Sequence, residues 1–231
     1  MEFTGIIQML NGGNLSRRFV VCSILVGLAF PSVALAEPDL GQADKAVGSK
    51  WRTYYEQGIE KSVSRKWRLN KVHMNVPESL TVSEKNRYAP KADIVWRGEP
   101  LGDRRKQVGA IMTTAVKSGA RGLRGGKRVD FNVEMIEFHA LSDKLRKSNI
   151  KAGIHNISFL IEVVDSRNGK VIVAKQPIQA DLIGYTGKQA KELVAAGQTQ
   201  KVRITNHVAV VIQGWLGQGP DMRKGIKRRG R

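Results

Sequence analysis

The alternation of apolar and polar residues predicts three successive β-strands between Val129 and Gly184. The first strand, residues 129–140, starts with apolar residues at odd positions, which is the period of a half-buried strand. From Ile136 onward the apolar residues fall at even positions. An uncorrected change of parity would turn every later side chain to the wrong face of the sheet. We therefore expect a β-bulge near Met135 and Ile136.

The two following strands are predicted at residues 154–164 and 170–182. Apolar residues on both faces of the first of these indicate a central strand that is covered on each side. A hairpin loop is predicted at residues 165–169, because Asn168-Gly169 supplies the positive φ angles that such turns require. Pro177 cannot donate a hydrogen bond to a neighbouring strand, so it marks a bulge or an edge of the sheet.

Two helices are predicted from apolar stripes with helical spacing. Asp103 is a suitable N-cap for a helix that ends at Gly119, and Thr199 begins the second helix. A short helix at 188–196, with Thr186 as its cap, is predicted between the sheet and the second helix. The stripes consist of Val108, Ile111, Met112, Ala115 and Val116 in one helix, and Ile204, Val208, Val211, Ile212 and Trp215 in the other.

Further elements are predicted ahead of these. Residues 51–63 have the spacing of a short amphipathic helix, residues 67–76 that of a strand with one change of phase, and residues 93–96 that of a short buried strand. Together the pattern predicts an α+β fold. An antiparallel sheet, made of a three-strand meander plus one or two N-terminal strands, would be covered on one face by two to three helices.

The first 36 residues have the layout of a secretory signal peptide. Arg17-Arg18 precede an apolar run of about 12 residues, and Ala34-Leu35-Ala36 forms a small-residue cleavage site. An uncleaved anchor helix is the alternative, although the run is shorter than the ~20 residues of a membrane span. We expect an exported protein, periplasmic or envelope-associated after cleavage near Ala36-Glu37. The predicted organisation is 1–36 signal peptide, 37–66 lead-in with a short helix, 67–216 single domain and 217–231 basic disordered tail.

Composition adds a strong positive charge and a lack of thiol chemistry. The 231 residues carry a formal net charge of +19, which favours nucleic acid, an anionic membrane or glycolipid surface, or an acidic polymer as partner. The single cysteine, Cys22, lies within the signal sequence, so the mature chain would have no disulfide or thiol nucleophile. The tail residues predicted to bind an anionic partner are Arg223, Lys224, Lys227, Arg228, Arg229 and Arg231.

Motifs for catalysis or for cofactors are weak. The four histidines, His73, His139, His155 and His207, do not have the spacing of a metal motif, so we predict no metal and no cofactor. His139 and His155 lie on predicted neighbouring strands and could meet. Residues 122–127 superficially suggest a phosphate loop, but they follow a helix and precede a strand, which is the reverse of the required order. A carboxylate pair could come from Asp93, Asp103, Asp130, Glu134 and Glu137.

Four runs are distinctive together, at residues 76–80, 93–98, 102–104 and 197–205. With them the chain resembles, over about residues 71–215, a family of uncharacterised exported bacterial envelope proteins, a domain of unknown function with many lipoprotein members. It implies an envelope location and no assigned activity. A typical lipoprotein member has a cysteine just after its signal, whereas this chain has none there.

These observations favour a non-enzymatic periplasmic or envelope protein. We expect a binding or accessory component of lipid, glycolipid or surface-structure assembly, with an envelope protein or an anionic lipid or glycolipid surface as partner. No transmembrane helix is expected in the mature chain. The alternatives are an envelope hydrolase with a carboxylate or histidine site, and a basic nucleic-acid-binding protein. The export signal argues against nucleic acid.

Overall fold

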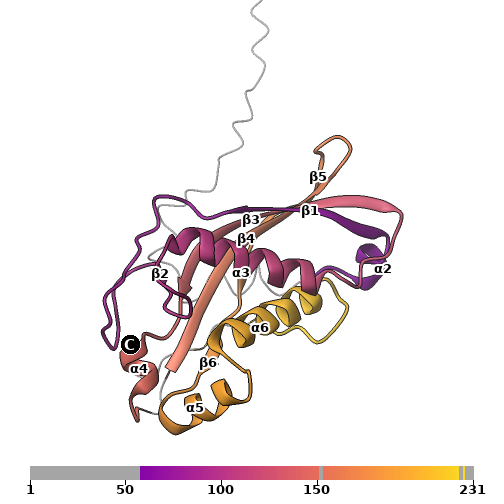
Figure 1. Ribbon diagram of the computed structural model, residues 1–231. Helices are drawn as coiled ribbons and strands as arrows, with labels where there is room; N and C mark the ends of the chain where they lie inside the picture. Colours follow the sequence, from indigo (N-terminus) through magenta and orange to yellow (C-terminus); the bar gives the residue numbers. More distant parts are fainter. Residues whose placement is uncertain (1–57, 151–152, 224–225, 227–231) are drawn as a thin grey trace, which may run out of the picture. The chain divides into compact units, whose positions relative to one another are not determined.

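The computed structural model describes residues 58–150, 153–223 and 226, which form a mixed α/β fold with an open sheet (Figure 1). Five helices and six strands are described in these residues. In chain order they are α2 (Lys61–Ser64), β1 (Trp67–Asn75), β2 (Ile94–Val95), α3 (Arg104–Gly119), β3 (Lys127–His139), α4 (Asp143–Lys147), β4 (Gly153–Asp165), β5 (Val171–Gln179), β6 (Leu182–Gly184), α5 (Gly187–Ala195) and α6 (Gln200–Trp215).

The sheet has the strand order β1-β3-β4-β5, with β2 added to β3 and β6 added to β4. β3, β4 and β5 are antiparallel neighbours. The predicted bulge is confirmed, because the register of β3 against β4 shifts between Met135 and Glu137. Gly169 has a φ of 70°, as predicted for the turn that joins β4 to β5. Pro177 lies on β5, which is an edge strand as the sequence predicted.

The prediction of an antiparallel sheet is wrong for the two N-terminal strands. β1 and β2 both pair with β3 in the parallel direction. Parallel neighbours need a long crossover connection, commonly a helix. The chain between β1 and β3 provides one, since it contains α3. The phase change predicted in β1 is confirmed, as the register shifts between Leu69 and Lys71.

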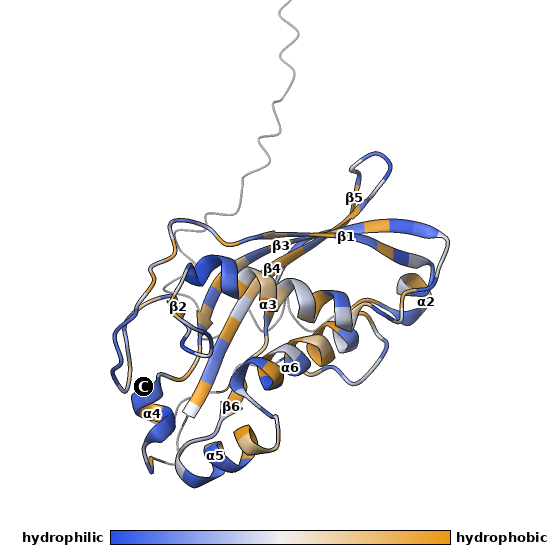
Figure 2. Ribbon diagram, in the orientation of Figure 1, coloured by the Kyte–Doolittle hydropathy of each residue, from blue (hydrophilic) through white to orange (hydrophobic). Residues whose placement is uncertain are grey.

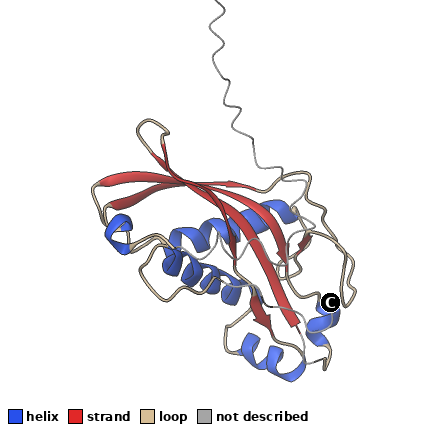
Figure 3. Ribbon diagram, turned by 180° about the vertical axis from the view of Figure 1, so that it is seen from behind, coloured by secondary structure: helices blue, strands red, loops and turns tan. Residues whose placement is uncertain are grey.

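Helices α3 and α6 lie beside each other against the sheet (Figures 1 and 3). The predicted caps are confirmed, because Asp103 accepts a hydrogen bond from the Lys106 amide (3.1 Å) and Thr199 accepts one from the Val202 amide (3.3 Å). All ten residues of the two predicted stripes are buried. Each large apolar side chain buried in this way contributes roughly 1.5–3 kcal/mol, which suffices to hold both helices on the sheet.

The core of the sheet consists of alternate residues of β3 and β4 (Figure 2). The ring of Phe131 on β3 meets that of Trp215 on α6 edge-on at 6.1 Å. Trp96, which follows β2, meets Phe138 in the same way at 5.7 Å. These edge-to-face pairs join segments that lie far apart in the sequence.

Two short helices differ from the prediction. Thr186 occupies the N-cap position of α5, but its hydroxyl accepts no hydrogen bond from the helix and instead donates one to the carbonyl oxygen of Ile150 (2.6 Å). Helix α4 was not expected. It begins at a cap formed by Ser142, whose hydroxyl accepts a hydrogen bond from the Leu145 amide (3.2 Å). Of the predicted helix at 51–63, the structure describes only residues from 58 onward, and α2 covers 61–64.

Three segments from distant parts of the sequence meet at the end of the domain that carries α2. The Ile59 amide donates to the carbonyl oxygen of Trp215 (2.7 Å), and the Ser64 hydroxyl donates to that of Leu216 (2.7 Å). The Gly125 amide donates to the carbonyl oxygen of Trp67 (2.6 Å). These bonds hold the start of the described chain, the turn between α3 and β3 and the end of α6 together.

Among the described helices, none has the length and apolar character that crossing a membrane requires.

Candidate functional site

A shallow hollow lies where the loop before α3 meets the beginning of that helix. Its volume is about 630 Å³. The lining residues are Glu78, Val82, Glu84, Leu101, Gly102, Asp103, Arg104 and Arg105.

Arg104, in the first turn of α3, links the walls of this hollow. Its side chain is 4% exposed, and its guanidinium contacts both carboxylate oxygens of Glu84, with Nη2 to Oε2 at 3.1 Å. Nη1 donates to the carbonyl oxygens of Glu99 and Pro100 (3.1 Å each) and to Oε1 of Gln107 (2.7 Å). All of its donor atoms are therefore committed to the protein itself.

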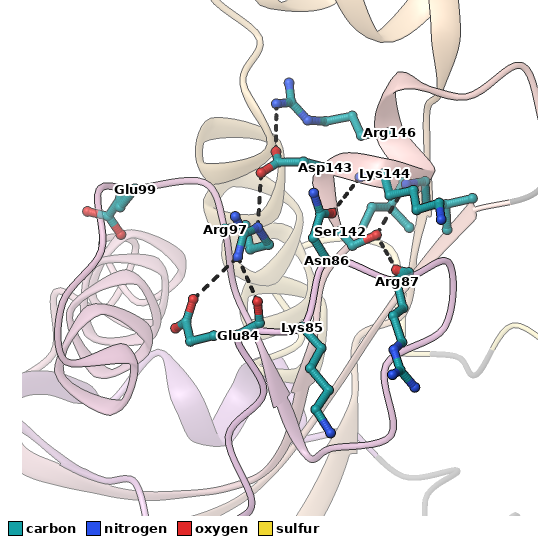
Figure 4. A network of polar contacts seen from close by, with 12 residues as sticks. Glu84, Lys85, Asn86, Arg87, Arg97, Glu99, Ser142, Asp143, Lys144 and Arg146 are labelled. Carbon is teal, nitrogen blue, oxygen red and sulfur yellow. Dashed lines mark hydrogen bonds and ion pairs between the residues drawn. The ribbon is translucent and has the colours of Figure 1, made fainter.

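A second arginine ties the same loop to α4 (Figure 4). Arg97 Nε donates to Oδ2 of Asp143 (3.0 Å), and Arg97 Nη1 donates to the carbonyl oxygen of Glu84 (2.9 Å). Arg146 contacts the other oxygen of Asp143 at 3.1 Å. The loop is further held by Asn86, whose Oδ1 accepts from the Lys144 amide (2.7 Å).

The carboxylates of this network are stabilised in the charged form. The hydrogen bond from Arg104 is the main cause that lowers the pKa of Glu84. Burial opposes ionisation of Glu99 and Asp143, but bonds from Lys201 and Trp96 lower the pKa of Glu99, and Arg97 and Arg146 lower that of Asp143. Carboxylates with lowered pKa values hold no proton near neutral pH, so they are poorly suited to general acid catalysis. The network therefore fixes the loop against α3 and α4.

The second hollow has a different electrostatic character. Its volume is about 370 Å³, and it lies where α2, the turn after α3 and the end of α6 meet. Three of its lining side chains are cations and none is an acid. The six lining residues are Lys61, Arg65, Gly122, Arg124, Gln213 and Gln218.

We call the exposed surface formed by Lys61, Arg65, Lys66, Arg121 and Arg124 the basic face. None of these five cations forms an ion pair with another described residue. The described residues include 28 lysines and arginines but only 15 aspartates and glutamates, so unpaired cations are to be expected.

Like charges also meet beside the basic face. Arg68 on β1 and Arg128 on β3 are direct register partners, and both are exposed. Like charges directly opposite each other on neighbouring strands are destabilising.

The two histidines that the sequence placed on neighbouring strands lie on opposite faces of the sheet. His155 is fully buried among core residues, whereas His139 lies beyond Phe138 on the opposite face of the sheet and is paired with Glu137 at 3.9 Å. The Nδ1 atom of His155 accepts a hydrogen bond from the Leu141 amide (3.3 Å). The two rings do not form a joint site. His73 lies on the exposed edge strand β1, 3.6 Å from Asp130.

Five carboxylates were candidates for a catalytic pair, and in the structure they have separate partners. Asp93 accepts from the amide and the hydroxyl of Thr81 (2.7 Å each), and Asp103 caps α3. Asp130 accepts from Asn70 and Ser166 (2.7 Å each), and Glu134 pairs with Lys175 at 3.3 Å. Glu137 lies beside His139.

Of the six predicted anion-binding residues in the tail, the structure describes only Arg223. Its guanidinium binds both oxygens of Asp221, and its side chain is 5% exposed. The prediction for the other five concerns positions outside the described residues. Within the described ranges, no group of three or more His, Cys, Asp or Glu side chains is placed to hold a metal ion.

Sequence reasoning missed the basic face. Lys61 and Arg65 come just before β1, and Arg124 lies about 60 residues further along in a run that was interpreted as a helix-to-strand turn. That interpretation is correct, because α3 ends at Gly119 and β3 begins at Lys127. The signal in the sequence was the density of cations in both segments. Only the fold shows that the two segments line one hollow.

The fold and the two hollows define a small mixed α/β protein with an open, mostly antiparallel sheet and a cationic surface at one end. The chain belongs to the family of unknown function DUF6778, which matches residues 67–230. No functionally curated protein matches the sequence.

Three solved structures illustrate what the chain is similar to. A Xanthomonas campestris protein of family DUF330 has a TM-score of 0.38 and 10% identity, and the match covers 66% of this chain and 88% of that one. A protein of Caulobacter crescentus CB15, described as a predicted lipoprotein, has a TM-score of 0.33 and 12% identity, with 68% and 95% covered. A PelC dodecamer of Paraburkholderia phytofirmans has a TM-score of 0.32 and 12% identity, with 69% and 94% covered. Similarity at this level carries no functional argument.

Proposed function

We propose that this protein is an exported, non-enzymatic envelope protein that binds an anionic envelope component. The observation that carries the proposal is the excess of cations over acids in the described residues, together with their concentration in a hollow without an acidic lining residue. A surface of this kind attracts anionic partners over several ångströms. The signal-like N-terminal sequence supports the envelope as the location of such partners.

The geometry favours binding over catalysis. An enzyme site needs a group that can exchange a proton near neutral pH or act as an activated nucleophile. In the larger hollow, Glu84 is held in its charged form by Arg104, and each of the three guanidinium nitrogens of Arg104 already bonds to the protein. His155 is fully buried in the core, away from solvent.

The export half of the proposal is tested by fractionating cells that express the native chain and measuring its intact mass. The expected species is found outside the cytoplasm and begins at Glu37. A variant with Ala34→Leu and Ala36→Leu removes the small residues of the cleavage site and should accumulate with its leader attached. A full-length cytoplasmic species would overturn export and would favour the nucleic-acid alternative.

The binding half is tested by washing isolated envelopes with salt. A protein held by surface charge is released as the salt concentration rises from ~0.1 M to ~1 M, because the Debye length falls from about 10 Å to about 3 Å. Retention of the cleaved protein at high salt, with no release, would show that another force holds it and would contradict charge-based binding.

A further inference from the structure

We propose that the basic face docks on the surface of a lipid bilayer and that the hollow between Lys61, Arg65 and Arg124 receives the phosphate of an anionic headgroup. This inference rests on the proposed function, because it names the partner class and the surface that contacts it. Arginine and lysine are the side chains that proteins use for phosphate oxygens, with guanidinium forming paired hydrogen bonds.

The basic face is built by the fold and is not a feature of one flexible segment. Gly125 lies so close to the backbone of Lys66 that an added Cβ would be 2.0 Å from its carbonyl carbon. The Lys127 amide donates to the Lys66 carbonyl oxygen (3.0 Å). Cations from α2 and from the turn after α3 are therefore fixed beside each other, with Gln213 and Gln218 of the third segment completing the hollow.

Folding stability explains only part of this concentration of charge. Helices α3 and α6 both end here, at Gly119 and Trp215, and the carbonyl groups at a helix C-terminus favour nearby cations. That effect fades within one turn of the helix. It does not account for the exposed pair Arg68 and Arg128 placed directly opposite each other. An external anion would relieve the repulsion among these groups.

A bilayer fits this surface better than a nucleic acid does. No aromatic side chain is among the residues that line the hollow, so stacking of bases, on which single-strand binding depends, is not provided. Val63 on α2 is 40% exposed and lies in the sequence between Lys61 and Arg65, the residue that follows the helix. In this docking mode Val63 would meet the boundary between headgroups and acyl chains while the two cations meet the headgroups.

The direction of the chain agrees with this orientation. Gly58, the first described residue, lies at this same end, since an added Cβ there would be 3.2 Å from the carbonyl oxygen of Trp215. After the proposed cleavage at Ala36, the chain from Glu37 therefore enters the domain next to the basic face.

The test is co-sedimentation of the full chain with vesicles of phosphatidylcholine alone and of phosphatidylcholine with about one third phosphatidylglycerol. The variant Lys61→Ser/Arg65→Ser/Arg124→Ser removes the three cations of the hollow. The control Lys85→Ser/Lys91→Ser/Lys191→Ser removes the same charge from exposed positions in the loop before β2 and in α5. Thermal unfolding checks that both variants are folded, and neutral vesicles report any binding by the apolar leader.

We expect the ratio of binding to anionic and neutral vesicles to fall about 100-fold in the hollow variant, because each cation near an anionic leaflet strengthens binding roughly five-fold. The control should lose less than about five-fold. Equal losses in both variants would show that net charge alone acts and would overturn the docking surface. Equal binding of the native chain to both vesicles would overturn it as well.

A competition arm separates partner classes. Duplex DNA and an acidic polysaccharide are each added to protein that is bound to anionic vesicles. The bilayer assignment is overturned if one of them displaces the protein, binds it more tightly than the vesicles do, and loses this binding in the hollow variant. These results do not depend on the cell fractionation. Export can therefore fail while the docking surface stands, and the reverse also holds.

Discussion

Arg104 shows how a single side chain can stabilise a loop that has little secondary structure of its own. Residues 76–103 include only the two-residue strand β2, yet the loop is fixed against α3 because one guanidinium binds Glu84, Gln107 and two backbone carbonyls. The sequence predicted Asp103 as the cap of α3 but gave no sign of the role of Arg104. Cap residues act locally, whereas Glu84 lies 20 residues away from Arg104.

Replacing Arg104 tests this role. Arg104→Met should lower the free energy of unfolding by about 2–3 kcal/mol, because the Glu84 carboxylate and two carbonyl groups lose their charged partner. Urea unfolding followed by circular dichroism measures the change. Lys106→Ala, two positions along the same helix and 87% exposed, is the control and should change the stability by less than about 0.5 kcal/mol. Similar stabilities of the two variants would show that Arg104 does not stabilise the loop.

His155 makes stability depend on pH. Burial, and then the nearby charges of Arg203, His139 and His207, lower the pKa of His155 to about 3. Below about pH 6.5 the unfolded chain binds a proton at this histidine that the folded protein does not bind. Stability is therefore lost as the pH falls from about 6.5 towards 3, by at most about 1.4 kcal/mol per pH unit.

The variant His155→Gln keeps an acceptor for the Leu141 amide but cannot take up a proton. Between pH 6 and pH 4 we expect the unfolding free energy of the variant to fall less steeply with pH than that of the native protein. The two slopes should differ by the slope that roughly half to one bound proton produces. Unfolding free energies from urea titrations at several pH values measure the slope. Identical slopes in the native and variant proteins would show that His155 does not titrate in this way.

At the scale of elements, local patterns predicted what depends on neighbours in sequence. Helices α3 and α6 follow from their apolar stripes and caps, and the bulge in β3 follows from the change of parity. The direction of β1 could not be read in this way, because an isolated apolar alternation is the same for parallel and antiparallel pairing. The basic face and helix α4 depend on contacts between distant segments, which one sequence without relatives does not reveal.

The packing of α2 against the end of α6, which forms the basic face, can be tested by substituting Gly217 there and Gly197 elsewhere as the control. Gly217 has a φ of 68°, and an added Cβ would lie 2.4 Å from the carbonyl oxygen of Ile59. Gly197 has a φ of 76° with nothing within 4 Å of the added atom. Gly197→Ala should cost about 1–2 kcal/mol through backbone strain alone, while Gly217→Ala should cost clearly more. Thermal unfolding of both variants gives the difference, and equal costs would show that α2 is not packed tightly on α6.

At the scale of the whole molecule, charge is the dominant feature. The described residues already have a large excess of cations, and the tail adds more at Lys224, Lys227, Arg228, Arg229 and Arg231. The sequence predicted membership of a family of unknown function, and the match to DUF6778 confirms it. The partner could not be predicted, because net charge does not identify which surface is presented.

The tail and the basic face can be separated by substitution. Replacing the five tail cations by serine should weaken binding to anionic vesicles by up to about five-fold per cation that reaches the lipid. Combined with the hollow variant, the losses should multiply if the two regions act independently. Co-sedimentation measures this. No loss in the tail variant would exclude the tail as an anion-binding arm.

The parallel pairing of β1 with β3 has a consequence for the order in which the protein can acquire its structure. Asn70 finds its partner, Asp130, 60 residues later in the chain. Contacts of such long range form slowly, because the intervening chain must first be brought into a loop. If the chain is exported as proposed, β1 would leave the channel before its partner β3, and the sheet could close only after most of the domain had followed. Late closure of the sheet would then favour an extended chain before passage, which is the state that a narrow channel requires.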